Sequence, residues 1–153
     1  MQKIIPFLWF NSNAEEAVNC YLSIFKTSKT LKTTYYGEGA PVPKGTIMTI
    51  DFMLNEQEFV AINGGPHYSF SPAISFVINC DSQEEIDHYW DKLSEGGTDM
   101  QCGWLTDKFG VTWQVVPTNI VELLYCPDKE KSQRAMNALF KMYKIDIKTL
   151  EQA

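Results

Sequence analysis

The first half of the chain alternates between apolar runs and polar breaks in a strand–helix–strand order. Residues 4–10 form a short apolar run, which predicts a buried strand. From Ala14 to Phe25, apolar residues recur every three or four positions, as they do on one face of an amphipathic helix. We expect Ser12 or Asn13 to cap this helix, with a glutamate of its first turn completing a capping box. Further strands are expected at 30–36, 46–54 and 58–62.

The same order begins again after residues 63–66 (Asn-Gly-Gly-Pro), where two glycines before a proline interrupt the pattern. We expect the next helix to be capped by Ser82 and to end at Gly96-Gly97. Residues 7–25 are thus echoed by residues 74–93, at an offset of about 68 residues, which indicates an internal repeat. The strands expected in this second half lie at 73–79, 101–105 and 111–116.

One βαβββ unit used twice sets the expected fold class, α+β. Each unit would form a small mixed sheet with a helix on one face, and neither could bury both faces of its sheet alone. We therefore expect the halves to pack together, with their remaining faces curving into a shared cup. The expected boundaries are residues 1–65 for the first module, 66–120 for the second and 121–153 for a C-terminal helical extension.

The C-terminal extension shows a helical stripe after Pro127-Asp128, which is a favourable helix start. The stripe predicts a lid on the main domain, and a helix that binds a partner or a second copy is the alternative. The residues that line this side are Ala135, Met136, Leu139, Phe140 and Tyr143.

Composition narrows the classes of function. The 153 residues fit one domain or a pair of fused half-domains, and 44% hydrophobic content excludes a disordered chain. Thirteen Lys and Arg against nineteen Asp and Glu give a net charge of −6, which disfavours nucleic-acid binding and polybasic membrane binding. Four Trp and 13% aromatic residues suit either a packed aromatic core or an aromatic-lined pocket.

The cysteines and the N-terminal residues predict a cytoplasmic protein. Four widely spaced cysteines form no CxxC pair, so a structural zinc site is not expected. The apolar start of the chain lacks the long apolar region and cleavage site of a signal peptide. We therefore expect the cysteines to be reduced, buried thiols.

Residues for metal or nucleotide chemistry are few. His88 lies among helix residues and is expected to be half-exposed, whereas His67 follows the Gly-Gly-Pro junction and is either a site residue or a plain loop residue. Zn or Fe requires about three ligands among His, Cys and carboxylates, and the acidic residues gather mainly on helix faces. No complete glycine-rich phosphate loop is present, so we expect no cofactor.

Gln114 is the informative polar residue because it interrupts the apolar strand 111–116. Strand alternation places it on one face with Thr112 and Val116. A buried amide must find hydrogen-bond partners, which a ligand cavity would supply. The alternative is that Gln114 lies on an edge strand and faces water.

Several motifs together resemble the PhnB-like family of the vicinal oxygen chelate superfamily, which also contains glyoxalases, bleomycin-resistance proteins and extradiol dioxygenases. The resemblance runs through the whole chain, including its tail. The motifs are Pro6-Phe7-Leu8-Trp9-Phe10, Ala14-Glu15-Glu16-Ala17, Asn63-Gly64-Gly65-Pro66-His67, Cys102-Gly103-Trp104-Leu105, residues 107–117 (DKFGVTWQVVP), Gln133-Arg134-Ala135-Met136 and Lys144-Ile145-Asp146-Ile147.

This resemblance implies paired βαβββ modules that form a U-shaped mixed sheet. It also implies that the superfamily's first-strand His ligand falls on Pro6 and its last-strand Glu ligand on Gln114, which is a poorer ligand for a divalent cation. In the same frame, Pro6, Leu8, Phe10 and Gln114 point into the cup, while Phe7 and Trp9 pack on the helix. Family members often carry a demethylubiquinone methyltransferase label, which nothing in the sequence supports as an activity.

The leading hypothesis is a cytoplasmic homodimer that binds a small, partly apolar molecule in its cup without a metal. A metal-dependent lyase, isomerase or dioxygenase with a rearranged ligand set such as His67 and Gln114 is the first alternative. A protein that docks a partner on its C-terminal helix is the second. The expected ligand-binding residues are Leu8, Phe10, Asn63, Gly64, Gly65, His67, Trp104 and Gln114, and no catalytic residue is assigned.

Overall fold

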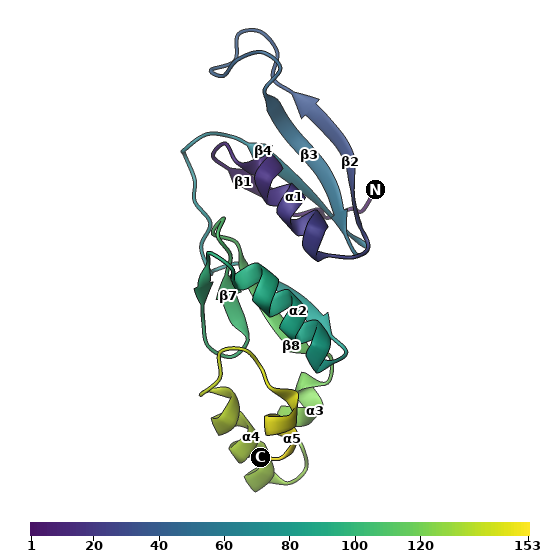
Figure 1. Cartoon of the computed structure of the whole chain (residues 1–153), viewed down its shortest axis with the longest axis vertical. Helices are drawn as coiled ribbons and strands as arrows, with labels where there is room; N and C mark the ends of the chain where they lie inside the picture. The colour runs from purple at the N-terminus through teal and green to yellow at the C-terminus, as the bar shows by residue number, and fades with distance from the viewer. The chain divides into compact units, whose positions relative to one another are not determined.

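The computed structural model describes residues 1–153 and divides them into two compact units, Met1–Phe70 and Ser71–Ala153 (Figure 1). Each unit holds one four-stranded sheet of mixed strand direction and one principal helix that packs on it. Strand, helix and three strands follow one another in the same order in both units. The predicted α+β class and the repeated βαβββ order are therefore confirmed. None of the helices has the length and apolar character needed to cross a bilayer.

Unit 1, Met1–Phe70, has a sheet in the order β1-β4-β3-β2. The edge strand β1 runs parallel to β4, and the other neighbours are antiparallel. Its elements are β1 (Phe7–Phe10), α1 (Ala14–Ile24), β2 (Ser28–Tyr35), β3 (Ile47–Leu54) and β4 (Gln57–Asn63).

Helix α1 covers one face of this sheet because its apolar positions recur at helical spacing. On the helix side, Ala17, Val18 and Tyr21 are almost completely buried. On the sheet side, Phe52 and Phe59 stack with ring centroids 5.4 Å apart. Burying an aliphatic or aromatic side chain contributes about 1.5–3 kcal/mol, so this layer holds the module together.

The outer edge of unit 1 is the irregular strand β2. Its pairing with β3 shifts register between Thr30 and Lys32 and again between Thr34 and Tyr35. Each shift is a bulge or similar irregularity, which increases the local twist of the strand. Most side chains of β2, including Lys29 and Lys32, are exposed.

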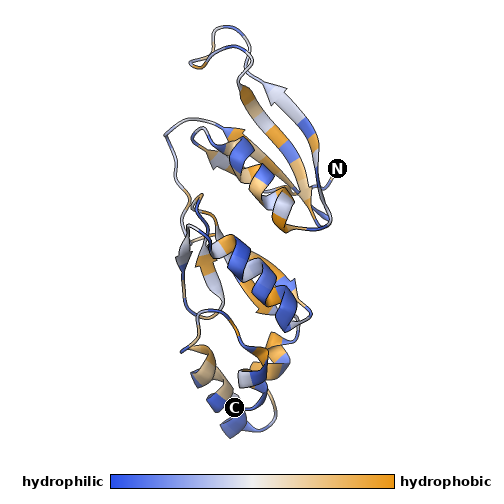
Figure 2. Ribbon diagram, in the orientation of Figure 1, coloured by the Kyte–Doolittle hydropathy of each residue, from blue (hydrophilic) through white to orange (hydrophobic).

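Unit 2, Ser71–Ala153, repeats the arrangement with the strand order β5-β8-β7-β6. Figure 2 shows the polar residues of α2 and the apolar residues of β8, which lies inside the sheet. The pair Thr98–Asp99 was not predicted as a strand because two residues carry no periodic signal. The elements are β5 (Phe76–Cys80), α2 (Gln83–Ser94), β6 (Thr98–Asp99), β7 (Trp104–Thr106) and β8 (Thr112–Pro117).

Three further helices complete unit 2: α3 (Ile120–Leu124), α4 (Lys129–Leu139) and α5 (Ile147–Glu151). They pack around a second apolar cluster that begins at Val116, the penultimate residue of β8. Phe140 and Tyr143 lie beyond the end of α4 and are each 55% exposed, so the prediction that they belong to its buried stripe is wrong. The cluster consists of Val116, Leu124, Ala135, Leu139, Ile145 and Leu150.

Candidate functional site

The sheet of unit 2 leaves one face without the cover of α2. Leu105, Trp113 and Val115 are buried and alternate with residues of the opposite face. On that opposite, open face, Gln114 pairs with Trp104 on one side and with Val77 on the other. Strand alternation thus brings two of the predicted site residues, Trp104 and Gln114, side by side.

The amide of Gln114 is half-buried and only partly used. Its Nε2 donates to Ser75 Oγ at 2.9 Å, and its Oε1 accepts no hydrogen bond within unit 2. Because β8 lies between β5 and β7, the alternative that Gln114 occupies an edge strand is wrong. An amide oxygen beside an indole offers an acceptor and an apolar surface together.

The facing of β1 in unit 1 is the reverse of the prediction. Leu8 and Phe10 are only 7% and 3% exposed and lie in register with Ala61 and Asn63, on the face that α1 covers. Phe7, 59% exposed, faces the other way with Trp9. A shift of one residue in a strand moves every side chain to the opposite face, so the frame taken from the resemblance was off by one. Leu8 and Phe10 are therefore packed beneath α1 instead of on the open face, and Pro6 lies just before the strand.

Trp9 is a residue that the sequence prediction missed, and it organises the segment after β4. Its Nε1 donates to Gly65 O at 2.9 Å, and a side chain at Gly64 would place Cβ 2.4 Å from its ring. Tyr68 meets the Trp9 ring edge-on at 5.0 Å, and His67 lies at 6.5 Å between ring centroids. The Trp9 ring is therefore the group that packs closely against Gly64.

Asn63 belongs to the face covered by α1. Its Oδ1 accepts from Ala14 N at 2.9 Å, and its Nδ2 donates to Ile47 O at 3.0 Å. One acceptor position and one donor position of the amide are thus engaged by the protein. The side chain serves mainly to hold the start of α1 on the sheet.

Asp51 is a second residue that the prediction overlooked. It lies in the middle of β3 on the open face of unit 1, since its neighbours in the strand, Ile50 and Phe52, are buried on the face beneath α1. Its cross-strand partners are Lys32 and Val60. The alternation of residues 46–54 could have revealed Asp51, because its carboxylate occupies a position whose side chain points away from the core.

A metal site does not assemble within either unit. No group of three or more His, Cys, Asp and Glu side chains comes together there. Cys80 is also unsuited to nucleophilic chemistry, because burial, aided by Glu85 and Asp81, raises its pKa to about 12. The polar chemistry of the open faces is that of neutral hydrogen-bonding groups and the Asp51 carboxylate.

Comparison with known proteins identifies the family. Residues 2–116 match the profile of the 3-demethylubiquinone-9 3-methyltransferase family. The chain belongs to this family. The PhnB protein from Bacillus cereus is 38% identical with a TM-score of 0.70, over 76% of this chain and 99% of that one. The predicted PhnB-like membership is therefore confirmed.

Other solved structures extend the comparison. Protein PA1353 from Pseudomonas aeruginosa is 26% identical with a TM-score of 0.63, over 76% of this chain and 98% of that one. The fosfomycin resistance protein FosX from Listeria monocytogenes, complexed with Mn(II) and sulfate, is 13% identical with a TM-score of 0.52, over 80% and 95%; at this identity it shows the shared fold alone. No protein with a curated function matches the chain.

The family match ends at Val116. The helices α3, α4 and α5 all follow this residue. The matched range does not include the C-terminal helices, so the expected resemblance of the tail stays a prediction.

Proposed function

We propose that this PhnB-like protein binds a small, partly apolar molecule on the open faces of its sheets and needs no metal to do so. The observation that carries the proposal is the pairing of Trp104 with Gln114 on the uncovered face of unit 2. A half-buried amide inside an apolar strand loses free energy unless its polar atoms are satisfied. Ser75 satisfies the donor side, and a ligand would satisfy the acceptor side.

This geometry supports a ligand that combines a polar and an apolar part. A hydroxyl or N–H group on the ligand would donate to Gln114 Oε1, while an apolar ring or chain would lie on the indole of Trp104. In unit 1, Trp9, His67 and Tyr68 form an aromatic cluster beside the open face, and it supplies the same kind of surface. We therefore propose a ligand with at least one hydrogen-bond donor on an apolar body.

Methyl transfer, which the family's name describes, is not part of this proposal. A doubly wound methyltransferase needs strands and helices that alternate throughout, and each unit here has three consecutive strands after its helix. Binding, rather than group transfer, is the function that the residues on the open faces support.

A thermal-shift screen of small aromatic and heterocyclic alcohols and amines tests the proposal. For each hit, Trp104→Ala and Gln114→Ala should each weaken binding about tenfold, because each removes one principal contact. Gln101→Ala is the matched control, since this exposed glutamine precedes β7 and lies outside the site. Hits that bind both variants as tightly as the unchanged protein would overturn the assignment.

Elemental analysis of protein purified without chelator separates this function from the metal-dependent alternative. One tightly bound transition metal per chain would favour an enzyme with a rearranged ligand set that includes His67 and Gln114. We expect no stoichiometric metal and unchanged ligand binding after treatment with a chelator.

We also propose that the protein acts as a cytoplasmic homodimer. Light scattering coupled to size-exclusion chromatography should give twice the 17.5 kDa mass of the chain. A helix-docking function is less well supported, because Ala135 and Leu139 on α4 are already buried in the core of unit 2. A monomeric mass would contradict the dimer and leave the ligand proposal to its own test.

A further inference from the structure

A groove of about 610 Å³ lies between α4 and α5, outside the open sheet faces described above. Arg134, Asn137 and Lys141 line it from the α4 side. Thr149 and Gln152 line it from the α5 side, and the half-buried Met142 also contributes apolar surface. The groove thus combines cationic groups and neutral hydrogen-bonding groups with an apolar wall.

The cationic groups stand out against the charge of the rest of the chain. Arg134 is the only arginine in the sequence. Residues 1–116 carry seven lysines and no arginine against fourteen Asp and Glu, whereas residues 117–153 carry six Lys and Arg against five Asp and Glu. The C-terminal helices therefore form a slightly cationic segment attached to an acidic one.

Arg134 and Lys141 have no internal counter-ion. The ion pairs of the protein join Lys44 to Glu38 and Lys144 to two aspartates, and neither groove cation takes part in one. Both side chains are exposed. A guanidinium can hold a carboxylate or phosphate through two parallel hydrogen bonds, which an ammonium cannot do.

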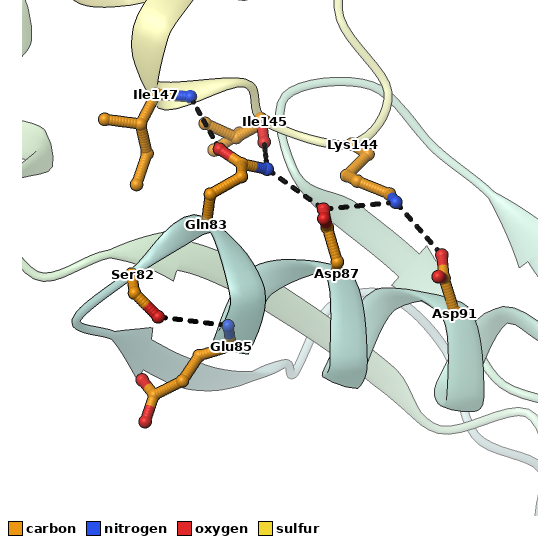
Figure 3. Close-up of polar contacts among 8 residues, drawn as sticks. All are labelled: Ser82, Gln83, Glu85, Asp87, Asp91, Lys144, Ile145 and Ile147. Atoms are coloured by element: carbon orange, nitrogen blue, oxygen red, sulfur yellow. Dashed lines mark hydrogen bonds and ion pairs between the residues drawn. The ribbon is translucent and has the colours of Figure 1, made fainter.

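Both walls of the groove are fixed in place. Ala135 and Leu139 anchor α4 and Leu150 anchors α5 in the same apolar cluster. The segment before α5 is held by Gln83 of α2, whose Nε2 donates to Ile145 O at 3.0 Å and whose Oε1 accepts from Ile147 N at 2.9 Å (Figure 3).

Further contacts hold the chain between α4 and α5. Lys144 pairs with Asp87 at 3.2 Å and with Asp91 at 3.0 Å, both on α2 (Figure 3). The backbone N–H groups of Cys102 and Gly103 donate to the carbonyls of Met142 and Tyr143. A site with walls fixed in this way loses little conformational entropy when a ligand binds.

We propose that this groove binds a free, small amphiphile with one anionic head, a carboxylate or a phosphate, and a short apolar body. Arg134 and Lys141 hold the head, Asn137 and Gln152 supply neutral hydrogen bonds, and Met142 contacts the apolar part. The site lies in the segment that the family match does not cover.

Calorimetric titration with octyl phosphate and with octanoate tests the site. We expect saturable binding of one molecule per chain, weakened about tenfold by Arg134→Gln and several-fold by Lys141→Gln, because each loses a charge-assisted contact. Lys131→Gln is the matched control: it removes one exposed charge from the same helix but does not line the groove. Octyltrimethylammonium, with the opposite charge, should not bind.

Amide chemical shifts locate the binding site. Binding to vesicles tests whether the ligand is a free amphiphile or a lipid surface. Octyl phosphate should shift the signals of Asn137, Thr149 and Gln152, and Trp104→Ala should leave this binding unchanged, which separates it from the proposed sheet-face site. Equal binding by Arg134→Gln and Lys131→Gln, or shifts confined to the sheets, would overturn the proposal. Binding to phosphatidylglycerol vesicles without binding to free octyl phosphate would also overturn it.

Discussion

The two modules begin their principal helices in different ways. In unit 2, Ser82 Oγ accepts from Glu85 N at 3.2 Å, and Glu85 Oε2 accepts from Asp81 N at 2.7 Å, so the cap is made by neighbours in sequence. In unit 1, the N-cap Asn13 makes no side-chain cap, and Asn63 at the end of β4 accepts from Ala14 N.

The internal repeat therefore preserves the order of the elements but not the contacts that hold them. The local cap of α2 depends on five consecutive residues, 81–85, and can fray and re-form without the sheet. The cap of α1 exists only when β4 is in place, since Asn63 lies 49 residues from Ala14. Helix α1 is therefore coupled to the folding of its sheet more strongly than α2 is.

The largest effect is expected from Asn63→Ala. This change removes two side-chain hydrogen bonds, one of which supplies the acceptor for Ala14 N, at a cost of about 3 kcal/mol in the free energy of unfolding. Chemical denaturation measures it. Asn13→Ala is the matched control and should cost less than about 0.5 kcal/mol, because Asn13 makes no side-chain cap. Equal losses in the two variants would contradict the long-range cap.

Gly64→Ala is expected to have the next largest effect. Its Cβ would lie 2.4 Å from the Trp9 ring, and moving this ring breaks the bond from Trp9 Nε1 to Gly65 O. Such overpacking costs about 2 kcal/mol and should change the fluorescence of Trp9. Gly37→Ala, with no atom within 4 Å of its new Cβ, should change neither stability nor fluorescence.

Ser82→Ala tests the local cap of α2. The loss of a local cap costs about 1 kcal/mol, and Ser82→Asp should restore most of it because aspartate caps equally well. Thermal unfolding followed by circular dichroism checks both variants. A loss as large as that of Asn63→Ala would show that the two helix starts are equally coupled to their sheets.

The smallest effect concerns the pH dependence of the ion pairs that Lys144 makes with Asp87 and Asp91 on α2. The hydrogen bond from Gln83, together with Lys144, lowers the pKa of Asp87 below 3.8. Burial opposes the charge of Lys144, but bonds to Asp91 and Asp87 outweigh it and raise the pKa of Lys144 above 10.5. The stabilisation from Asp87 is lost as the pH falls below about 4, and that from Lys144 as it rises above about 10.5.

Lys144→Gln should therefore cost less than about 1 kcal/mol near neutral pH, as expected for an exposed ion pair. The cost should shrink at both extremes of pH. Denaturation at pH 3, 7 and 11 measures the difference between this variant and the unchanged protein. A cost that stays constant across these conditions would show that Lys144 acts through packing and not through charge.

Most of the fold could be predicted because its signals are local. The helical spacing from Ala14, the Ser82 cap and the strand at 111–116 each appear in a few consecutive residues, and the repeat of about 68 residues links them into two modules. The two-residue strand β6 was missed because it depends entirely on pairing with β7.

The site was harder to predict because it depends on which face each strand buries. Alternation placed Gln114 correctly, since Trp113 and Val115 are unambiguous core residues. In β1, four consecutive apolar residues give no alternation, so the facing of Leu8 and Phe10 was taken from the resemblance and was reversed. Only the pairing with β4 and the contact with α1 decide which side chains of β1 face the helix.

The irregular outer strand β2 has a consequence for the behaviour of the protein at high concentration. A straight, regular edge would invite another chain to add a strand and extend the sheet into an aggregate. The two register shifts disrupt the regular hydrogen-bonding geometry that such an addition needs. The exposed Lys29 and Lys32 add like charges that would repel a second copy of the strand. Unit 1 thus protects itself against intermolecular β-pairing along that side.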